Sequence, residues 1–206
     1  MTAFQKTYRR ITLLQTYSIY WRALRAIPSM KNYRRSEIIS QQFSERLMLA
    51  VTEVNGCAVC SYAHAKMALE AGLTEKEINA MLSGMNEDVP AEERPAVLFA
   101  QHYAETKGRP SQLSLDKMEK LYGKQKTDAV LCAIQVIMLG NTFGIPLGAL
   151  AGRLRHTKHK NGPATNLGYE IMMLLALIVF LPFCAVTALL AAVLHAPRTA
   201  VQSKKA

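Results

Sequence analysis

The chain has 206 residues, of which 50% are hydrophobic and 19% are charged, so it can bury a core and does not have the composition of a disordered protein. Its net charge of +10 comes from two basic flanks: residues 1–40 hold eight Lys and Arg against one acid and residues 153–206 hold seven against one, whereas residues 41–152 hold ten against thirteen. This distribution excludes a nucleic-acid-binding core and favours contact of the flanks with an anionic membrane surface.

The first predicted helix forms an N-terminal segment that we place at residues 1–35. Apolar residues recur at helical spacing from Phe4 to Ile27, and arginines, among them Arg22 and Arg25, interrupt this stripe. We expect an amphipathic helix whose apolar stripe packs on the core and whose basic face is solvated. Binding of that basic face to a membrane surface is the alternative.

A second helix is predicted from about Ser36 to Val54, at the start of a central domain that we place at residues 36–155. It becomes apolar on all sides at residues 47–51, which indicates burial. Glu45 stands just before this apolar run, so we expect its carboxylate to be partly buried and to face the next helix. Glu53 is the rival acid, but its place near the following turn predicts that it is exposed.

A third helix, from about Cys57 to Gly72, carries the residues with the most chemistry. Asn55-Gly56 before it favours a turn. Cys57, Cys60 and His64 are spaced by three and four residues, so they lie on one stripe of this helix. The free N–H groups of the first turn would stabilise a thiolate, and His64 would accept or relay a proton from Cys60.

Three other interpretations of this motif compete with a redox dithiol. A c-type haem site needs a histidine directly after the second cysteine, where this chain has Ser61. A zinc site would have only three local ligands, with Glu45 as the candidate for a fourth. Two buried structural thiols beside a satisfied histidine are the third interpretation, which the shared stripe with His64 weakens. The spacing therefore favours redox chemistry and leaves a metal site and a structural role open.

The rest of the central domain also has helical periodicity, and no segment shows the alternation of a β-strand. Thr74 and Glu77 predict a capping box at the start of a fourth helix. Further helices are expected at about residues 90–107, 114–122 and 127–153. In the last of these, a glycine at every fourth position makes a face that a neighbouring helix can approach closely: Gly140, Gly144, Gly148 and Gly152.

The final segment, residues 156–206, is predicted to be a basic linker followed by an apolar helix. Residues 171–194 contain no charged residue and are long enough to cross a bilayer. A buried core helix or an oligomer interface is the alternative to a membrane span. The sequence therefore predicts an all-α protein with an apolar C-terminal helix.

The middle of the chain, about residues 36–152, resembles the carboxymuconolactone decarboxylase/alkylhydroperoxidase D (AhpD) family. The resemblance rests on Glu45 twelve residues before Cys57, on the CxxC motif that ends at Cys60, and on His64 four residues later. It implies an AhpD-like helical bundle that assembles as a homo-oligomer (dimer, trimer or hexamer).

The resemblance also implies a peroxiredoxin-type function, that of a thiol-dependent hydroperoxide reductase or disulfide oxidoreductase. Cys57 and Cys60 would cycle between dithiol and disulfide, with Cys60 attacking the peroxide, Cys57 resolving the sulfenic acid, and Glu45 and His64 relaying the proton. Helix position alone instead nominates Cys57 as the thiol of lower pKa. The implied partners are a hydroperoxide substrate and a thiol or dithiol reductant, and no cofactor is implied beyond the redox-active Cys57–Cys60 disulfide.

Two features depart from the family pattern. Val59 stands where AhpD proteins have a second histidine, and the apolar tail is absent from the simplest members. The alternative functions are a non-enzymatic redox sensor or adaptor and a cofactor-free carboxymuconolactone decarboxylase, which the CxxC disfavours. We expect a cytoplasmic protein, anchored to the inner membrane through residues 171–194, with no nucleic-acid partner.

Overall fold

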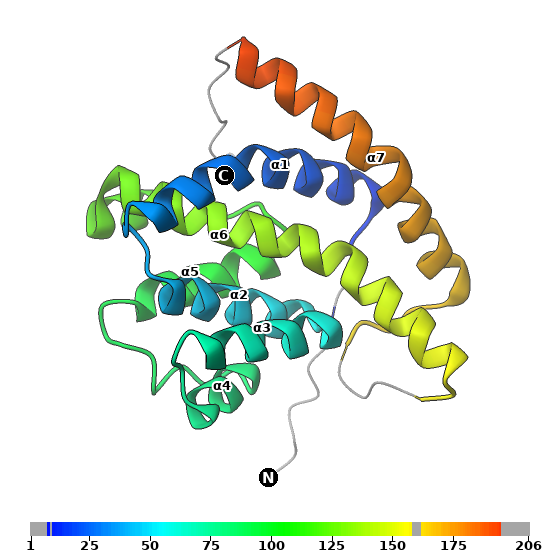
Figure 1. Cartoon of the computed structure of the whole chain (residues 1–206), viewed down its shortest axis with the longest axis horizontal. Coiled ribbons are helices and arrows are strands. Elements are labelled where there is room, and N and C mark those ends of the chain that lie inside the picture. Colours follow the sequence, from blue (N-terminus) through cyan, green and yellow to red (C-terminus); the bar gives the residue numbers. More distant parts are fainter. Residues whose placement is uncertain (1–7, 9, 158–161, 195–206) are drawn as a thin grey trace.

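The computed structural model describes residues 8, 10–157 and 162–194, and all regular secondary structure in this part of the chain is helical. Seven α-helices lie within it (Figure 1): α1 (Leu13–Arg35), α2 (Gln41–Asn55), α3 (Ala58–Glu70), α4 (Glu75–Leu82), α5 (Arg94–Glu105), α6 (Gln112–Leu154) and α7 (Leu167–Val193). The all-α prediction with an apolar C-terminal helix is thereby confirmed.

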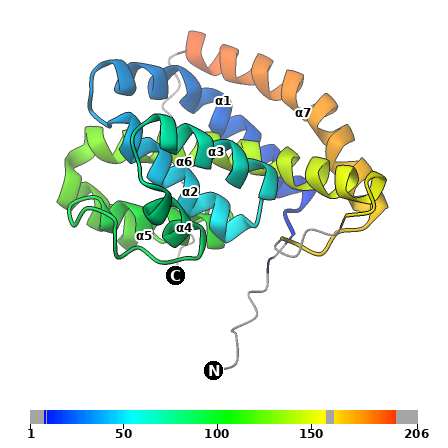
Figure 2. The ribbon, with the colours of Figure 1, turned by 60° about the horizontal axis from the view of Figure 1, so that its bottom comes forward.

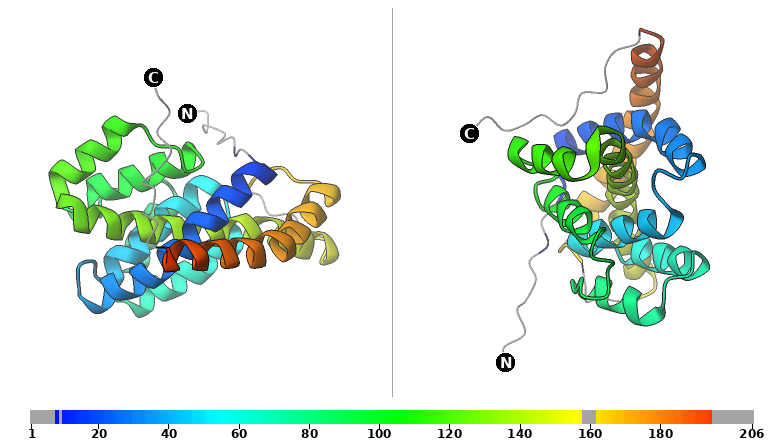
Figure 3. Two further views of the ribbon diagram at one scale, coloured as in Figure 1. Left: turned by 90° about the horizontal axis from the view of Figure 1, so that it is seen from above. Right: turned by 90° about the vertical axis from the view of Figure 1, so that its left-hand side faces the viewer.

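The long helix α6 runs through the middle of the molecule and the other helices pack around it (Figures 1 and 3). α1 and α7 lie side by side against one side of α6, whereas α2, α3 and α5 pack on its other side, with α4 at the far edge. One hydrophobic core extends through these layers, from Met173 in α7 through Leu47 in α2 to Ile78 in α4. The three segments that we distinguished share this core, so their division at residues 35 and 155 stays a prediction.

α1 starts later and ends later than its apolar stripe predicts. Thr12 caps the helix and forms a capping box with Gln15, and the described residues before it, including Tyr8, are not helical; residues 1–7 and 9 lie outside the described part of the chain. Pro28 lies inside the helix without ending it. The expected solvated basic face is wrong for Arg22, which is buried and donates a hydrogen bond to the carbonyl of Gly108.

The α2–α3 hairpin forms at the predicted Asn-Gly turn, because Gly56 has a φ of 69° that glycine adopts without a steric penalty. α2 begins at Gln41, five residues after the predicted start, because the Ser40 side chain caps it by accepting the N–H of Phe43. α3 ends in a Schellman motif, in which the N–H groups of Gly72 and Leu73 return to the last turn. α3 packs against both α2 and α6 (Figure 2).

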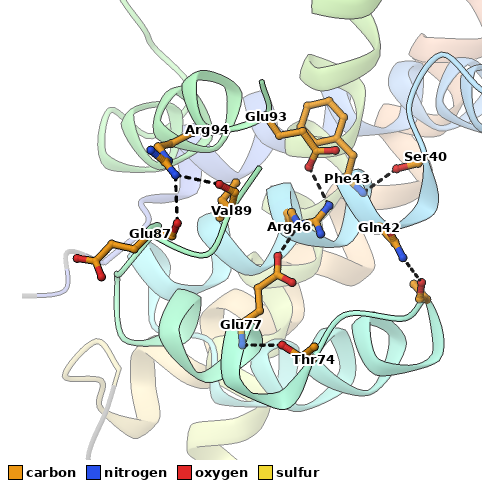
Figure 4. Close-up of polar contacts among 11 residues, drawn as sticks. Ser40, Gln42, Phe43, Arg46, Thr74, Glu77, Glu87, Val89, Glu93 and Arg94 are labelled. Atoms are coloured by element: carbon orange, nitrogen blue, oxygen red, sulfur yellow. Dashed lines mark hydrogen bonds and ion pairs between the residues drawn. The ribbon is translucent and has the colours of Figure 1, made fainter. Parts of the chain in front are cut away.

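A buried charge cluster attaches α2 to α4 and α5 (Figure 4). Arg46 donates to Glu77 at 2.6 Å and to Glu93 at 2.9 Å. The predicted capping box at Thr74 is therefore only half formed: Thr74 accepts the N–H of Glu77, but the Glu77 carboxylate pairs with Arg46. Burial alone would lower the pKa of Arg46, but the two carboxylates raise it overall. Burial raises the pKa of Glu93, although Arg46 opposes this change.

α6 joins the two helices predicted at residues 114–122 and 127–153. The join is a kink at Gly123, whose φ of 74° and ψ of 164° are not helical. Pro146 lies inside the helix. After α6, the described part of the linker leads to α7, whose first turn contains Glu170, a carboxylate with no exposed surface that pairs with Arg153 at 2.9 Å. Residues 158–161 and 195–206 lie outside the described part.

Candidate active site

The two cysteines of the CxxC motif lie at the N-terminus of α3 and are joined as a disulfide, with 5.2 Å between their Cα atoms. Cys57 is the N-cap residue of α3, and its Sγ accepts the N–H of Cys60 at 3.3 Å. The N-cap position is where a helix presents unpaired N–H groups, which favour a sulfur that carries negative charge. The prediction that both cysteines lie in the first turn is therefore right for Cys60, whereas Cys57 lies just before that turn.

Glu45 and His64 form the second half of the site. The Oε2 atom of Glu45 lies 2.8 Å from Nδ1 of His64, and the two side chains are 3% and 14% exposed. Glu45 lies in the part of α2 that is buried on all sides, as its position before the apolar run predicted. A buried carboxylate at this distance fixes the orientation of the imidazole ring and leaves Nε2 as the nitrogen that can exchange a proton with another group.

His64 follows Cys60 by one helical turn, so the Glu45–His64 pair and the disulfide lie next to each other along α3. The structure thus brings all four predicted residues to one helix and the buried helix beside it. Their catalytic roles stay predictions.

The glycines of α6 form the surface on which the disulfide rests. A Cβ atom on Gly144 would lie 2.7 Å from the Sγ atoms of both Cys57 and Cys60, and one on Gly148 would lie 2.9 Å from a methyl group of Val59. Such distances are shorter than carbon–sulfur and carbon–carbon contacts allow. The close helix approach that the glycine repeat predicted therefore exists, and the structure shows that its purpose at Gly144 is to make room for the disulfide.

A cavity of about 410 Å³ opens next to the first cysteine. Its walls include Gly56 and Ala58, which flank Cys57, together with Gly144 and Gly148 of α6. Arg153 contributes to the same cavity. Mostly small apolar residues line this space, so it has room for a small organic ligand close to the disulfide.

The disulfide itself has little contact with solvent, because Cys57 is 1% and Cys60 is 7% exposed. Two residues from outside the predicted central domain pack on Gly56 next to Cys57: a Cβ on Gly56 would meet the ring of Tyr8 at 2.7 Å and Gly162 at 2.9 Å. The sequence did not predict these two contacts, since both residues lie in segments without regular structure.

Two other polar residues on α2 and α6 are buried. Glu53 is buried at 8% exposure, so the prediction that it is exposed near the turn is wrong; it packs against Gly84. Asn141 is fully buried and its side-chain oxygen accepts a hydrogen bond from Thr52 at 3.4 Å.

The predicted fourth zinc ligand, Glu45, is engaged by His64. Among the residues that the structure describes, no group of three or more His, Cys, Asp and Glu side chains is arranged to hold a metal ion.

Comparison with known proteins gives one family. Residues 23–101 match the model of the Carboxymuconolactone decarboxylase family, which confirms the resemblance inferred from the sequence. The match starts within α1, ends within α5 and contains the four residues of the candidate site. No curated protein and no solved structure matches the chain.

Proposed function

Because residues 23–101 carry a carboxymuconolactone decarboxylase family domain with a CxxC disulfide, we propose that the protein is a thiol-dependent hydroperoxide reductase or disulfide oxidoreductase. The observation that carries the proposal is the Cys57–Cys60 disulfide one helical turn before a histidine that a buried glutamate orients at 2.8 Å. A thiol pair, a proton carrier and a group that fixes the carrier are the parts that thiol-based peroxide reduction requires.

The first step is attack by the Cys60 thiolate on a hydroperoxide. The sulfur takes the terminal oxygen as the O–O bond breaks, Cys60 becomes a sulfenic acid, and the leaving alkoxide takes a proton to become an alcohol. His64, with Nδ1 held by Glu45, takes the thiol proton through Nε2 and returns it to the leaving oxygen. The greater exposure of Cys60, 7% against 1% for Cys57, supports its role as the attacking sulfur.

The second step regenerates the disulfide. Cys57 attacks the sulfenic sulfur, the S–S bond forms and water leaves. An external thiol or dithiol then reduces the disulfide in two exchange steps and becomes oxidised itself. The N–H of Cys60, which lies 3.3 Å from the Cys57 sulfur, would stabilise the Cys57 thiolate released during this exchange. The reaction therefore needs a hydroperoxide and a thiol reductant, and no cofactor beyond the disulfide.

We further propose a homo-oligomer, as a dimer, trimer or hexamer, in the cytoplasm at the inner membrane. The support for the membrane is that two helices, α6 and α7, are long and apolar enough to cross one by length and composition. Of these, α6 is mostly buried inside the protein and α7 is mostly exposed.

Dithiol-dependent consumption of a hydroperoxide by the wild type and by Cys60→Ser tests the proposal. We expect turnover that the Cys60→Ser variant lacks and that Cys57→Ser reduces to a single turnover, with a sulfenic acid on Cys60 that a cyclic dione captures. Cys132→Ser is the matched control, because Cys132 is a buried cysteine outside the site. Equal rates for the wild type and Cys60→Ser would falsify the assignment.

A second candidate function is a redox sensor or adaptor without turnover. The observation that favours it is that both sulfurs are almost fully buried, since a sensor functions even when an oxidant reaches its sulfur atoms only slowly. In that case the Cys57–Cys60 disulfide forms and is reduced reversibly, while the same assay shows negligible peroxide consumption.

A further inference from the structure

The outward face of α7 is apolar along its whole length. From Ile171 to Val193, every exposed side chain is apolar; among them are Leu175, Ile178, Val179, Phe183, Val186 and Leu190. A continuous exposed apolar face of this length is uncommon on a soluble monomer, and it marks a surface that another apolar medium covers.

The inner face of α7 is firmly attached to α1. Met173 and Cys184 are fully buried, the ring of Tyr17 in α1 lies 6.0 Å from that of Phe180, and the Tyr169 hydroxyl donates to the carbonyl of Ile11. The two helices run side by side in the same direction (Figure 1), since residues near the start of α1 meet the start of α7 and residues near Pro28 meet Ala188. α1 and α7 therefore pack together as one layer.

The layer formed by α1 and α7 is also cationic. Besides the buried Arg22, α1 contains four Arg and Lys and no Asp or Glu, and the one carboxylate of α7, Glu170, has no exposed surface. Arg25 lies at an apolar groove of about 470 Å³ between the two helices, together with Leu24 and Ala188. A cation beside an apolar groove is the combination that an anionic lipid fits.

These observations favour a membrane over a second copy of the chain as the partner that covers the outward face of α7. Two copies that paired through this face would bring cationic layers together with no exposed carboxylate on either helix to compensate. An anionic lipid surface supplies both the apolar medium and the opposite charge.

They also decide how α7 meets the bilayer. Because α1 is packed along α7, a helix α7 that crossed the bilayer would carry Arg25 into the hydrocarbon region, which is strongly unfavourable. A helix that lies in the plane of the interface keeps this cation at the headgroups.

We propose that the α1–α7 layer docks in the plane of an anionic membrane, with the outward face of α7 inserted at the headgroup boundary and the candidate active site on the side of α6 away from the lipid. This inference deepens the membrane location given under the proposed function and does not depend on the redox chemistry. It orients α4, with the exposed acids Glu75 and Glu70 near it, away from the anionic surface.

Binding of the full chain to vesicles tests the docking mode. We expect binding to phosphatidylcholine vesicles that contain 30% phosphatidylglycerol, weaker binding to pure phosphatidylcholine, and release by high salt or by an alkaline carbonate wash. Ile178→Gln and Val186→Gln together remove two inserted side chains and should weaken binding by about tenfold or more. Leu113→Gln is the control, since Leu113 is exposed on α6 outside this layer.

The depth of insertion separates the two membrane arrangements. In a Trp21→Phe background, which removes the one natural tryptophan, Phe183→Trp reports depth through quenching by brominated lipids. Quenching by bromine near the headgroups supports in-plane docking. Quenching strongest at the chain ends, with resistance to carbonate, would show that α7 spans the bilayer and overturn the proposal.

Absence of vesicle binding would also overturn it, and a dimer that Ile178→Gln dissociates would identify a second copy as the occupant. Peroxide consumption measured on the same samples without vesicles tests the redox function separately, so that failure of one proposal is distinguishable from failure of the other.

Discussion

The α2–α3 hairpin and the α1–α7 layer differ in the side chains that they bury: the hairpin buries polar ones, and the layer exposes apolar ones. In the hairpin, Glu45 and His64 lie inside the protein and meet at a defined distance of 2.8 Å, next to a disulfide that is almost fully covered. In the α1–α7 layer, apolar side chains of α7 lie outside, and cations such as Arg25 lie on the neighbouring helix α1. The first arrangement depends on the exact position of a few atoms, and the second depends on surface area and charge, which tolerate single changes.

The largest difference should follow from removing the buried carboxylate of the hairpin. Glu45→Gln keeps the shape of the side chain but no longer stabilises a protonated His64, and we expect peroxide turnover to fall by about a hundredfold or more. Glu53→Gln is the matched control, because Glu53 is a buried acid on the same helix. The pH profile of kcat should change for Glu45→Gln only; equal losses in the two variants would contradict a specific role for Glu45.

The two faces of α7 provide the next comparison. Met173 is fully buried and Ile178 is 69% exposed. Met173→Ala should lower the free energy of unfolding by about 2–5 kcal/mol because it leaves a cavity, whereas Ile178→Ala should change it by less than about 0.5 kcal/mol. Urea unfolding without lipid measures both. Similar losses for both variants would show that the outward face is covered in solution.

Substitution of the α6 glycine beneath the disulfide should have a smaller effect on the free energy of unfolding. Gly144→Ala places a methyl group 2.7 Å from both sulfurs, so α3 must move away from α6, and we expect a loss of about 1–3 kcal/mol together with slower formation of the disulfide. Gly140→Ala, on the same face, meets its nearest neighbour at 3.7 Å and should stabilise the helix by up to about 1 kcal/mol. Thermal unfolding of both variants checks the sign; a stabilising Gly144→Ala would contradict the contact.

The smallest effect concerns Glu93 in the buried charge cluster. Burial raises the pKa of Glu93 above its ordinary value of 4.5, so the folded state favours the protonated form. This contribution is complete below about pH 4.5 and is lost as the pH rises through the folded-state pKa. Relative to Glu93→Gln, which does not titrate, the wild type should therefore lose stability as the pH rises above 4.5. A difference that grows in favour of the wild type would reverse the sign and show that Arg46 dominates.

Much of the fold could be predicted from local patterns in the sequence. The helical periodicity, the Asn-Gly turn and the terminal glycine of α3 each depend on contacts within a few residues, so they persist in the tertiary structure. The helix starts were less accurate, because caps such as Thr12 and Ser40 override an apolar stripe that extends beyond them.

The wrong predictions concern mainly polar side chains whose environment depends on long-range contacts. Arg22 and Glu53 were expected to be exposed and both are buried. Arg22 is stabilised by the carbonyl of Gly108, 86 residues away, which no local pattern indicates. The Glu77 carboxylate likewise leaves its capping box for Arg46, since a buried cation offers a stronger partner than a backbone N–H.

The sequence by itself determined the residues of the candidate site and their stripe on one helix, because spacings of three and four residues are properties of the α-helix. Only the tertiary structure decided that Gly144 makes room for the disulfide, that Tyr8 and Gly162 pack on Gly56 beside it, and that α7 lies along α1 with an apolar face outward. These features join residues that are 48 (Tyr8 and Gly56) to 163 (Tyr17 and Phe180) positions apart, and their contacts exist only once the helices pack around α6.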